Sequence, residues 1–176
     1  MKTTTLFVLM TCYSLLFSHQ INAMENEEGK ERQNECSMLY SDFKTNSFLR
    51  EFFTTYKLNN LYKHTDSDLD KALAVLHWSN KQWKHNGSNP APSNNAFDIL
   101  EEAKKGKCFR CTEYAIVFST AANACGLKAR TLDLKTKDCE TRESGAGHST
   151  AEVYLEDLGK WVFMDPQNDV VAFKDS

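Results

Sequence analysis

Gly106-Lys-Cys-Phe-Arg-Cys-Thr-Glu-Tyr-Ala115 is the stretch that predicts how this 176-residue chain is organised. From Cys111 onward, small or apolar residues recur at steps of four and three, as they do on one face of an α-helix. They are Cys111, Ala115, Phe118, Ala122 and Cys125. Gly126 follows at a position where helices commonly end in glycine. The pattern therefore predicts a helix that carries Cys111 in its first turn.

A thiol in the first turn of a helix ionises more easily than an ordinary thiol. The positive end of the helix dipole stabilises the thiolate, which is the nucleophilic form of cysteine. Cys111 would then serve as a nucleophile if the fold brings a histidine to it. The alternative is a buried structural cysteine, which is the better interpretation of such a residue standing alone.

The N-terminal residues have the features of a secretory signal peptide. Lys2 is followed by a mostly apolar run from Leu6 to Phe17, and Ala23 is a small residue suited to cleavage. The run is shorter than the roughly 20 residues that span a bilayer. We expect residues 1–23 to be removed, residues 24–40 to form a mobile arm and residues 41–176 to form one domain of a secreted or periplasmic protein.

The remaining composition is that of an ordinary globular domain with a core of its own. Loss of Lys2 changes the 21 basic and 24 acidic residues to 20 and 24, a formal charge of about −4. This balance favours neither nucleic acid nor a membrane surface as a partner. Five cysteines remain after cleavage, and oxidising surroundings predict pairing with one thiol left over.

The order of elements predicts an α+β fold. Periodicity and breakers indicate helices at about 47–58, 67–85 and 95–105 before the Cys111 helix. Alternating patterns then indicate strands at about 128–134, 148–155 and 160–164, with a further strand at 169–173. Helices followed by consecutive short-connected strands predict a helical layer packed on an antiparallel sheet.

The expected hairpin brings a histidine close to a carboxylate. If the turn at 156–159 is two to four residues long, His148 lies opposite Asp165 or is offset from it by about two positions. Cross-strand neighbours have Cβ atoms about 5 Å apart, and diagonal neighbours about 7–8 Å. Either arrangement lets the carboxylate fix the tautomer of the ring and stabilise its positive charge. The sequence alone does not show that the Cys111 helix packs against this hairpin.

Four blocks together resemble the transglutaminase-like superfamily of cysteine enzymes, over about residues 78–168. They are Gly106-x-Cys-x-x-Cys-Thr-Glu-Tyr-Ala115, Gly126-Leu-Lys-Ala-Arg130, His148-Ser-Thr-Ala-Glu152-Val-Tyr154 and Trp161-Val-Phe-Met-Asp165-Pro166. The resemblance implies a papain-like core in which a helix carrying the nucleophile packs on an antiparallel sheet. The chain looks like a secreted, bacterial-type member of this superfamily. Arg130 and Glu152 are expected to support the fold through salt bridges.

By position in these blocks, the resemblance implies Cys111 as nucleophile, His148 as general base and acid, and Asp165 as the orienting carboxylate. It implies acyl transfer from a peptide or protein substrate through a thioester, with no cofactor or metal. The backbone N–H of Cys111 is expected to face the oxyanion, and the second donor or a site wall is expected from Gln82, Trp83 or His85. Trp83 is also a natural core residue, and His85 a natural helix end. The family often has an aromatic residue at the position of Thr150, which leaves acceptor specificity open.

Three other interpretations compete with this one. Cys108-Phe-Arg-Cys111 matches the CxxC of a thiol–disulfide oxidoreductase, although that motif normally follows a strand. A transglutaminase-like fold can also serve as a binding module without chemistry. Finally, a metal site is possible in ligand type but lacks a second closely spaced ligand pair; its ligands would be Cys108, Cys111, Cys139 and His148.

Overall fold

A computed structural model describes residues 43–63, 65 and 67–172 of the chain. The expected signal peptide and arm, residues 1–40, lie outside this part. Within it the protein is an α+β domain with four α-helices and one four-stranded antiparallel sheet, so the predicted fold class is confirmed. None of the described helices combines the length and the hydrophobicity needed to cross a membrane.

Three helices precede the central one. They are α2 (Ser47–Thr55), α3 (Asp68–Asn80) and α4 (Ala96–Lys104), with a short 3-10 helix at Leu58–Asn60. Side chains of Asn46, Ser67 and Asn95 accept hydrogen bonds from the first-turn N–H groups and so begin the three helices. Capping by these side chains satisfies donors that have no partner inside the helix.

Two of the predicted helices are shorter than the sequence indicated. The first ends at Thr55, before Lys57 adopts a left-handed conformation with φ of 51°. The second ends at Asn80 instead of His85. Trp83 is buried as predicted, but it packs against Phe109 and Tyr114 from a turn beyond the helix. Packing of a large aromatic side chain therefore outweighs continuation of the helical pattern.

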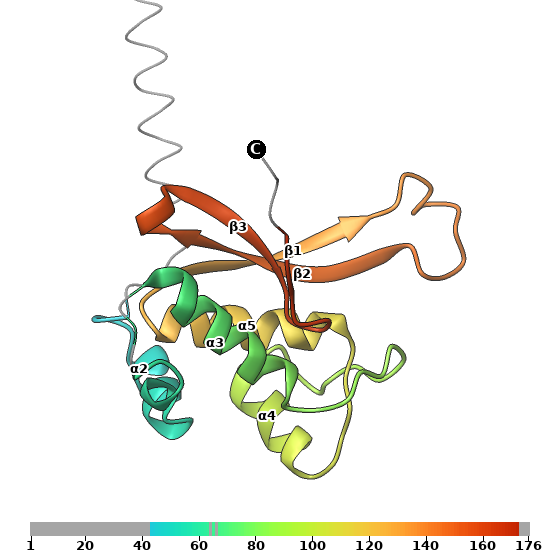
Figure 1. The fold of residues 1–176 in the computed structure, drawn as a ribbon. Helices are drawn as coiled ribbons and strands as arrows, with labels where there is room; N and C mark the ends of the chain where they lie inside the picture. The colour runs from blue at the N-terminus through green and yellow to red at the C-terminus, as the bar shows by residue number, and fades with distance from the viewer. Residues whose placement is uncertain (1–42, 64, 66, 173–176) are drawn as a thin grey trace, which may run out of the picture. The chain divides into compact units, whose positions relative to one another are not determined.

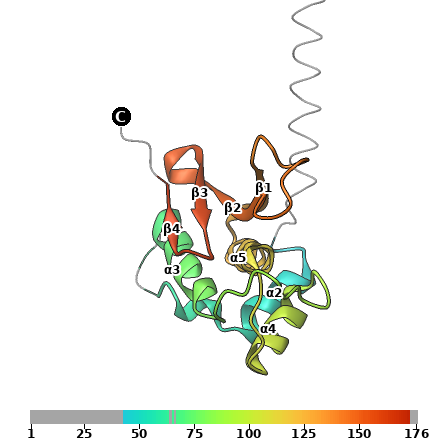
Figure 2. The ribbon, with the colours of Figure 1, turned by 90° about the vertical axis from the view of Figure 1, so that its right-hand side faces the viewer.

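The central helix α5 (Cys111–Ala124) begins at the predicted cysteine. It lies between the sheet and the other helices, against β1 and β2 on one side and against α2, α3 and α4 on the other (Figures 1 and 2). Gly126 follows it with φ of 81°, a conformation that favours glycine. An element enclosed on both sides must be apolar nearly all round, and most of α5 is buried.

The sheet has the strand order β1-β2-β3-β4. Its strands are β1 (Lys128–Lys135), β2 (Gly147–Leu155), β3 (Lys160–Asp165) and β4 (Val170–Val171). The ion pair expected to support the fold joins Arg130 to Glu152 directly across β1 and β2. The guanidinium also lies 4.4 Å from the centre of the Trp161 ring.

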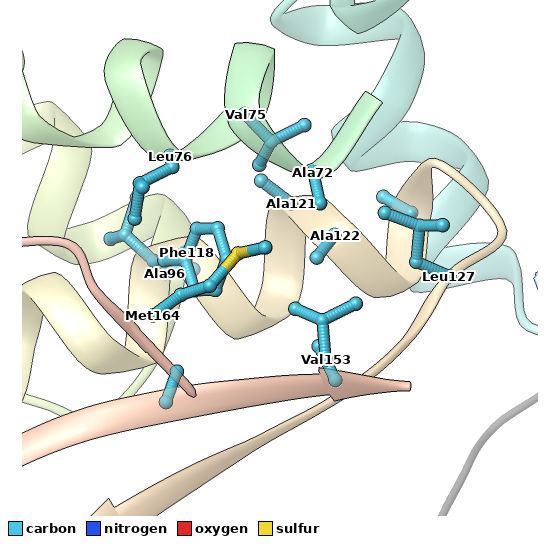
Figure 3. Close-up of a cluster of buried hydrophobic side chains, with 14 of the residues drawn as sticks. Ala72, Val75, Leu76, Ala96, Phe118, Ala121, Ala122, Leu127, Val153 and Met164 are labelled. Atoms are coloured by element: carbon cyan, nitrogen blue, oxygen red, sulfur yellow. The ribbon is translucent and has the colours of Figure 1, made fainter. Parts of the chain in front are cut away.

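The core fills the space between α5, α3 and the sheet. Phe118 and Ala122 of α5 lie between Val75 and Leu76 of α3 and Val153 of β2 (Figure 3). These side chains are almost completely excluded from solvent. Burying the Val, Leu and Phe side chains among them contributes about 1.5–3 kcal/mol each. The same packing fixes where the first turn of α5 meets the sheet, which positions the candidate site.

Candidate active site

The Cys111 thiol lies at the N-terminal end of α5, beside strand β2. The backbone N–H of Ser149 donates a hydrogen bond to Sγ of Cys111 at 3.4 Å. The thiol is partly buried, and all four described cysteines are free thiols, so Cys111 is not held in a disulfide with Cys108, Cys125 or Cys139. The pairing expected for an exported protein does not occur among these four.

His148 and Asp165 meet across the β2–β3 hairpin. Nε2 of His148 lies 2.8 Å from Oδ2 of Asp165. Leu155 pairs with Lys160 and Ala151 with Met164, so continuing the register places Thr150 opposite Asp165. His148 lies two residues before Thr150 on β2, in the diagonal arrangement that the hairpin estimate allowed. Since Nε2 faces the carboxylate, the other ring nitrogen is available to a nucleophile.

The site favours a charged thiolate and imidazolium. Burial opposes ionisation of Cys111, but the N–H of Ser149 and the His148 ring outweigh it, so the pKa of the thiol lies below its ordinary value. Burial likewise opposes protonation of His148, but Asp165 and then Cys111 raise the pKa of the imidazole above its usual range. The N-terminal end of α5 adds a favourable dipole for the thiolate.

Asp165 is held in place by the turn that follows it. Its Oδ1 accepts hydrogen bonds from the N–H groups of Gln167 and Asn168, and its Oδ2 accepts one from Nδ2 of Asn168 at 2.7 Å. Asn80, the last residue of α3, donates to the carbonyls of Pro166 and Gln167. The carboxylate is thus oriented by its own turn, and that turn is fixed to a helix.

Glu113 fixes the segments around the nucleophile. It is 1 % exposed, and its carboxylate accepts hydrogen bonds from the backbone N–H and the guanidinium of Arg110, the residue that caps α5. It also accepts one from the N–H of Ala91 at 3.1 Å. Burial opposes ionisation of this carboxyl, but the bonds from Arg110 and Ala91 hold its pKa below the ordinary value. A single buried charge therefore joins the start of α5 to the loop before α4.

Three residues were predicted to line the site, and of these Trp83 packs against α5, the helix that carries the nucleophile. Its indole N–H is available as a hydrogen-bond donor. Its ring centre lies 4.4 Å from that of Tyr114, and its carbonyl accepts a hydrogen bond from the Tyr114 hydroxyl at 2.7 Å. Its buried Nε1 has no hydrogen-bond partner within the described part of the chain. Gln82 instead donates to the carbonyl of Trp78, and His85 is exposed.

Thr150 occupies the position where the family often has an aromatic residue. It is fully buried, and its hydroxyl donates to the carbonyl of Met164 at 2.7 Å. It therefore joins β2 to β3 and does not form a wall of the site.

Neither the metal-site nor the redox interpretation gains support from the described residues. Among the described residues no three His, Cys, Asp or Glu side chains are grouped as metal ligands, so the alternative with Cys108, Cys111, Cys139 and His148 is not supported. Cys108 lies in the segment between α4 and α5, so the CxxC follows a helix and not a strand. The structure also joins Thr112 and Asp133 through the hydroxyl of Ser149, the residue whose N–H donates to the thiol. The sequence patterns did not indicate these three residues.

The comparisons with known proteins agree with this fold. The family model described as the transglutaminase-like superfamily matches residues 57–166. A provisionally assigned cysteine protease from Cytophaga hutchinsonii has a similar structure, with a TM-score of 0.53 and 16 % identity. The alignment covers 76 % of this chain and 45 % of that one. No curated protein gives a significant match.

Two further solved structures have TM-scores below 0.5. A protein named as a TGase has a TM-score of 0.47 and 17 % identity, over 86 % of this chain and 40 % of that one. A provisionally assigned protease from Parabacteroides distasonis has a TM-score of 0.46 and 10 % identity, over 73 % of this chain and 25 % of that one. The chain thus spans less than half the length of each of the three proteins.

Proposed function

The chain belongs to the transglutaminase-like superfamily, and from this premise we propose that it is a cysteine-dependent enzyme that cleaves amide bonds in peptides or proteins. The observation that carries the proposal is the juxtaposition of a thiol favoured as thiolate with a histidine bonded to a carboxylate at 2.8 Å. Neither half would indicate chemistry alone, because buried thiols and His–Asp pairs are both common structural features.

The proposed reaction is acyl transfer through a thioester. His148 takes the proton of the Cys111 thiol, and the thiolate forms a bond to the amide carbon. The carbon–nitrogen bond then breaks, and the amine leaves with the proton that His148 returns. Water attacks the thioester, giving its proton to His148, and the carboxylic acid and free thiol are released. Asp165 keeps the ring oriented and stabilises its positive charge in both halves.

Two donors are proposed to face the oxyanion of the tetrahedral intermediates. The first is the backbone N–H of Cys111, which opens α5 and has no partner inside the helix. The second is Nε1 of Trp83, since a buried donor without a partner is costly unless it serves a ligand. Trp83→Phe retains the aromatic packing and removes only this donor, so it separates the two roles of the residue.

Hydrolysis is proposed over transfer to an amine. Water is always available, whereas the sequence gives no indication of a pocket for a second amine. The substrate is proposed to be a peptide or protein outside the cytoplasm, an expectation that rests on the signal-like residues 1–23.

The test is a mass-spectrometric search for an acyl adduct on Cys111. Purified protein is incubated with a peptide library, with and without added amines, and quenched in acid to preserve thioesters. We expect an adduct on Cys111 that disappears with time as shortened or deamidated peptides accumulate. His148→Ala should abolish it, whereas Cys108→Ala should leave it intact.

Two results would overturn this proposal. Reversible formation of a Cys108–Cys111 disulfide with reductase activity, lost in Cys108→Ala, would establish the redox enzyme. Peptide binding without any adduct, unchanged in Cys111→Ala, would establish a binding module. Amine-linked products would retain the thioester chemistry but replace hydrolysis with transglutamination.

A further inference from the structure

A chain of three side chains from three elements runs past the thiol. Oγ1 of Thr112, in the first turn of α5, lies 3.0 Å from Oγ of Ser149 on β2. Oγ of Ser149 in turn lies 2.7 Å from Oδ1 of Asp133 on β1. Asp133 and Ser149 are direct partners across the two strands. Ser149 is also the residue whose backbone N–H donates to Sγ of Cys111.

The direction of these hydrogen bonds is fixed by their chemistry. An ionised carboxylate only accepts, so the Ser149 hydroxyl must donate its single proton to Asp133. The oxygen of Ser149 then accepts from Thr112, and the same side chain also interacts with the Cys111 thiol. Ser149, the central member, is 9 % exposed, whereas Asp133 lies at an exposed position of β1. With the carboxylate ionised, this arrangement of protons orients the Thr112 and Ser149 hydroxyls.

We propose that Thr112, Ser149 and Asp133 are positioning residues, which hold the first turn of α5 against β2 so that the Ser149 N–H points at the Cys111 sulfur. The strand ladder already fixes the backbone of Ser149, so the group whose position the chain controls is the neighbouring thiol. Its relevance to catalysis rests on the proposed function, but the effect on the thiol itself does not.

The charges around the thiol allow an orienting role of Asp133 to be told apart from an electrostatic one. His148 on β2 and Arg110 at the start of α5 are cations that favour the thiolate. The negative charge of a carboxylate such as Asp133 would by itself oppose a thiolate. If Asp133 supports the thiolate, it must do so through its hydrogen bond to Ser149 and not through its charge. Asp133→Asn retains an acceptor oxygen and removes the charge. Alkylation of the Cys111 thiol should therefore be no slower in this variant than in the wild type.

The experiment measures alkylation of Cys111 by iodoacetamide across pH 5–10, with the modified peptide quantified by mass spectrometry. One hydrogen bond contributes about 1 kcal/mol, equivalent to about fivefold in rate. Thr112→Val and Ser149→Ala should each slow alkylation at pH 6.5 about three- to tenfold and move the midpoint upward. The double variant should be no slower than Ser149→Ala alone, because both substitutions break one connection. Thr112→Ser should restore most of the rate.

Ser119→Ala is the matched control. Ser119 is a buried serine of α5, 7 % exposed, and its hydroxyl has no partner within the described part of the chain. Its removal should leave the alkylation profile unchanged. Thermal unfolding of each variant shows whether the domain remains folded, and only folded variants are compared.

Wild-type profiles in folded Thr112→Val and Ser149→Ala would overturn the proposal, as would additive effects in the double variant. Slower alkylation in folded Asp133→Asn would also contradict the proposal, because this variant keeps an acceptor oxygen and removes a charge that opposes the thiolate. Iodoacetamide requires no substrate site. The protein can therefore fail to form any peptide adduct, which refutes the proposed function, while the alkylation profiles still establish positioning of the thiol.

Discussion

Asp165→Asn tests how the carboxylate controls the thiol. Oδ2 of Asp165 accepts hydrogen bonds from the His148 ring and from the side-chain amide of Asn168. The substitution can keep Oδ1, which accepts from the two backbone N–H groups of the turn, and place an NH2 group at the position of Oδ2. This group would donate to Nε2 of His148, leaving the ring proton on the nitrogen that should receive the proton of the thiol.

The size of the effect follows from the bond that is lost. A hydrogen bond to a charged group contributes about 1.5–3 kcal/mol, equivalent to about 10- to 150-fold. The His148 side chain is 32 % exposed, so solvent screening favours the lower part of this range. We expect alkylation of Cys111 by iodoacetamide at pH 6.5 to be about tenfold slower in Asp165→Asn, because less imidazolium is present to stabilise the thiolate.

Asp169→Asn provides a closely matched control. Asp169 lies in the same connection, and its carboxylate is 2.8 Å from Nδ1 of His77, so the same chemical change removes a similar contact away from the thiol. Its φ of 56° is a conformation that asparagine tolerates well. Alkylation of Cys111 should be unchanged in this variant. Equal rates in folded Asp165→Asn and wild type, or equal slowing by both variants, would refute the reasoning.

Three further outcomes are expected. Alkylation of Cys111 should rise with pH through a midpoint below the ordinary thiol value of about 8.5, whereas Cys125, whose burial raises its pKa to about 12, should remain unreactive over that range. Glu113→Gln should lower the free energy of unfolding by about 1–3 kcal/mol at pH 7 in urea titrations. Because the pKa of Glu113 is depressed by folding, this difference should diminish as pH falls through its folded value. Tyr114→Phe should cost about 1–2 kcal/mol in the same assay, since the buried carbonyl of Trp83 loses its partner.

The elements that periodicity predicts are those whose burial is one-sided or complete. The Cys111 helix and the strands around His148 and Lys160 lie where their patterns placed them, within a residue or two. The helix predicted to reach His85 does not, because the spacing of Trp83 continues the helical pattern although its ring packs from a turn. A buried aromatic residue marks the core, but its spacing alone does not show which element carries it.

The contacts around the thiol depend on docking that local patterns do not contain. His148 and Asp165 are joined by a short hairpin, so counting residues limited their separation. Asp133 and Ser149 are direct partners as well. However, an 11-residue connection separates β1 from β2, so counting residues cannot determine the register of these two strands. The hydrogen bond from the Ser149 N–H to the thiol requires α5 to pack on the sheet, which is decided by the whole core.

The geometry at Cys111 therefore results from two separable constraints. The register of β2 and β3 sets the diagonal between His148 and Asp165, and a shift by one residue would turn the carboxylate to the other face. The four-residue connection that fixes this register ends in Gly159, with φ of 61°. The packing of α5 independently sets the distance of the sulfur from β2. An extra residue in the connection should thus separate His148 from Asp165 while the thiol stays beside Ser149. A cavity made by truncating Phe118 should instead weaken the contact of the thiol with Ser149 and leave the His148–Asp165 pair intact.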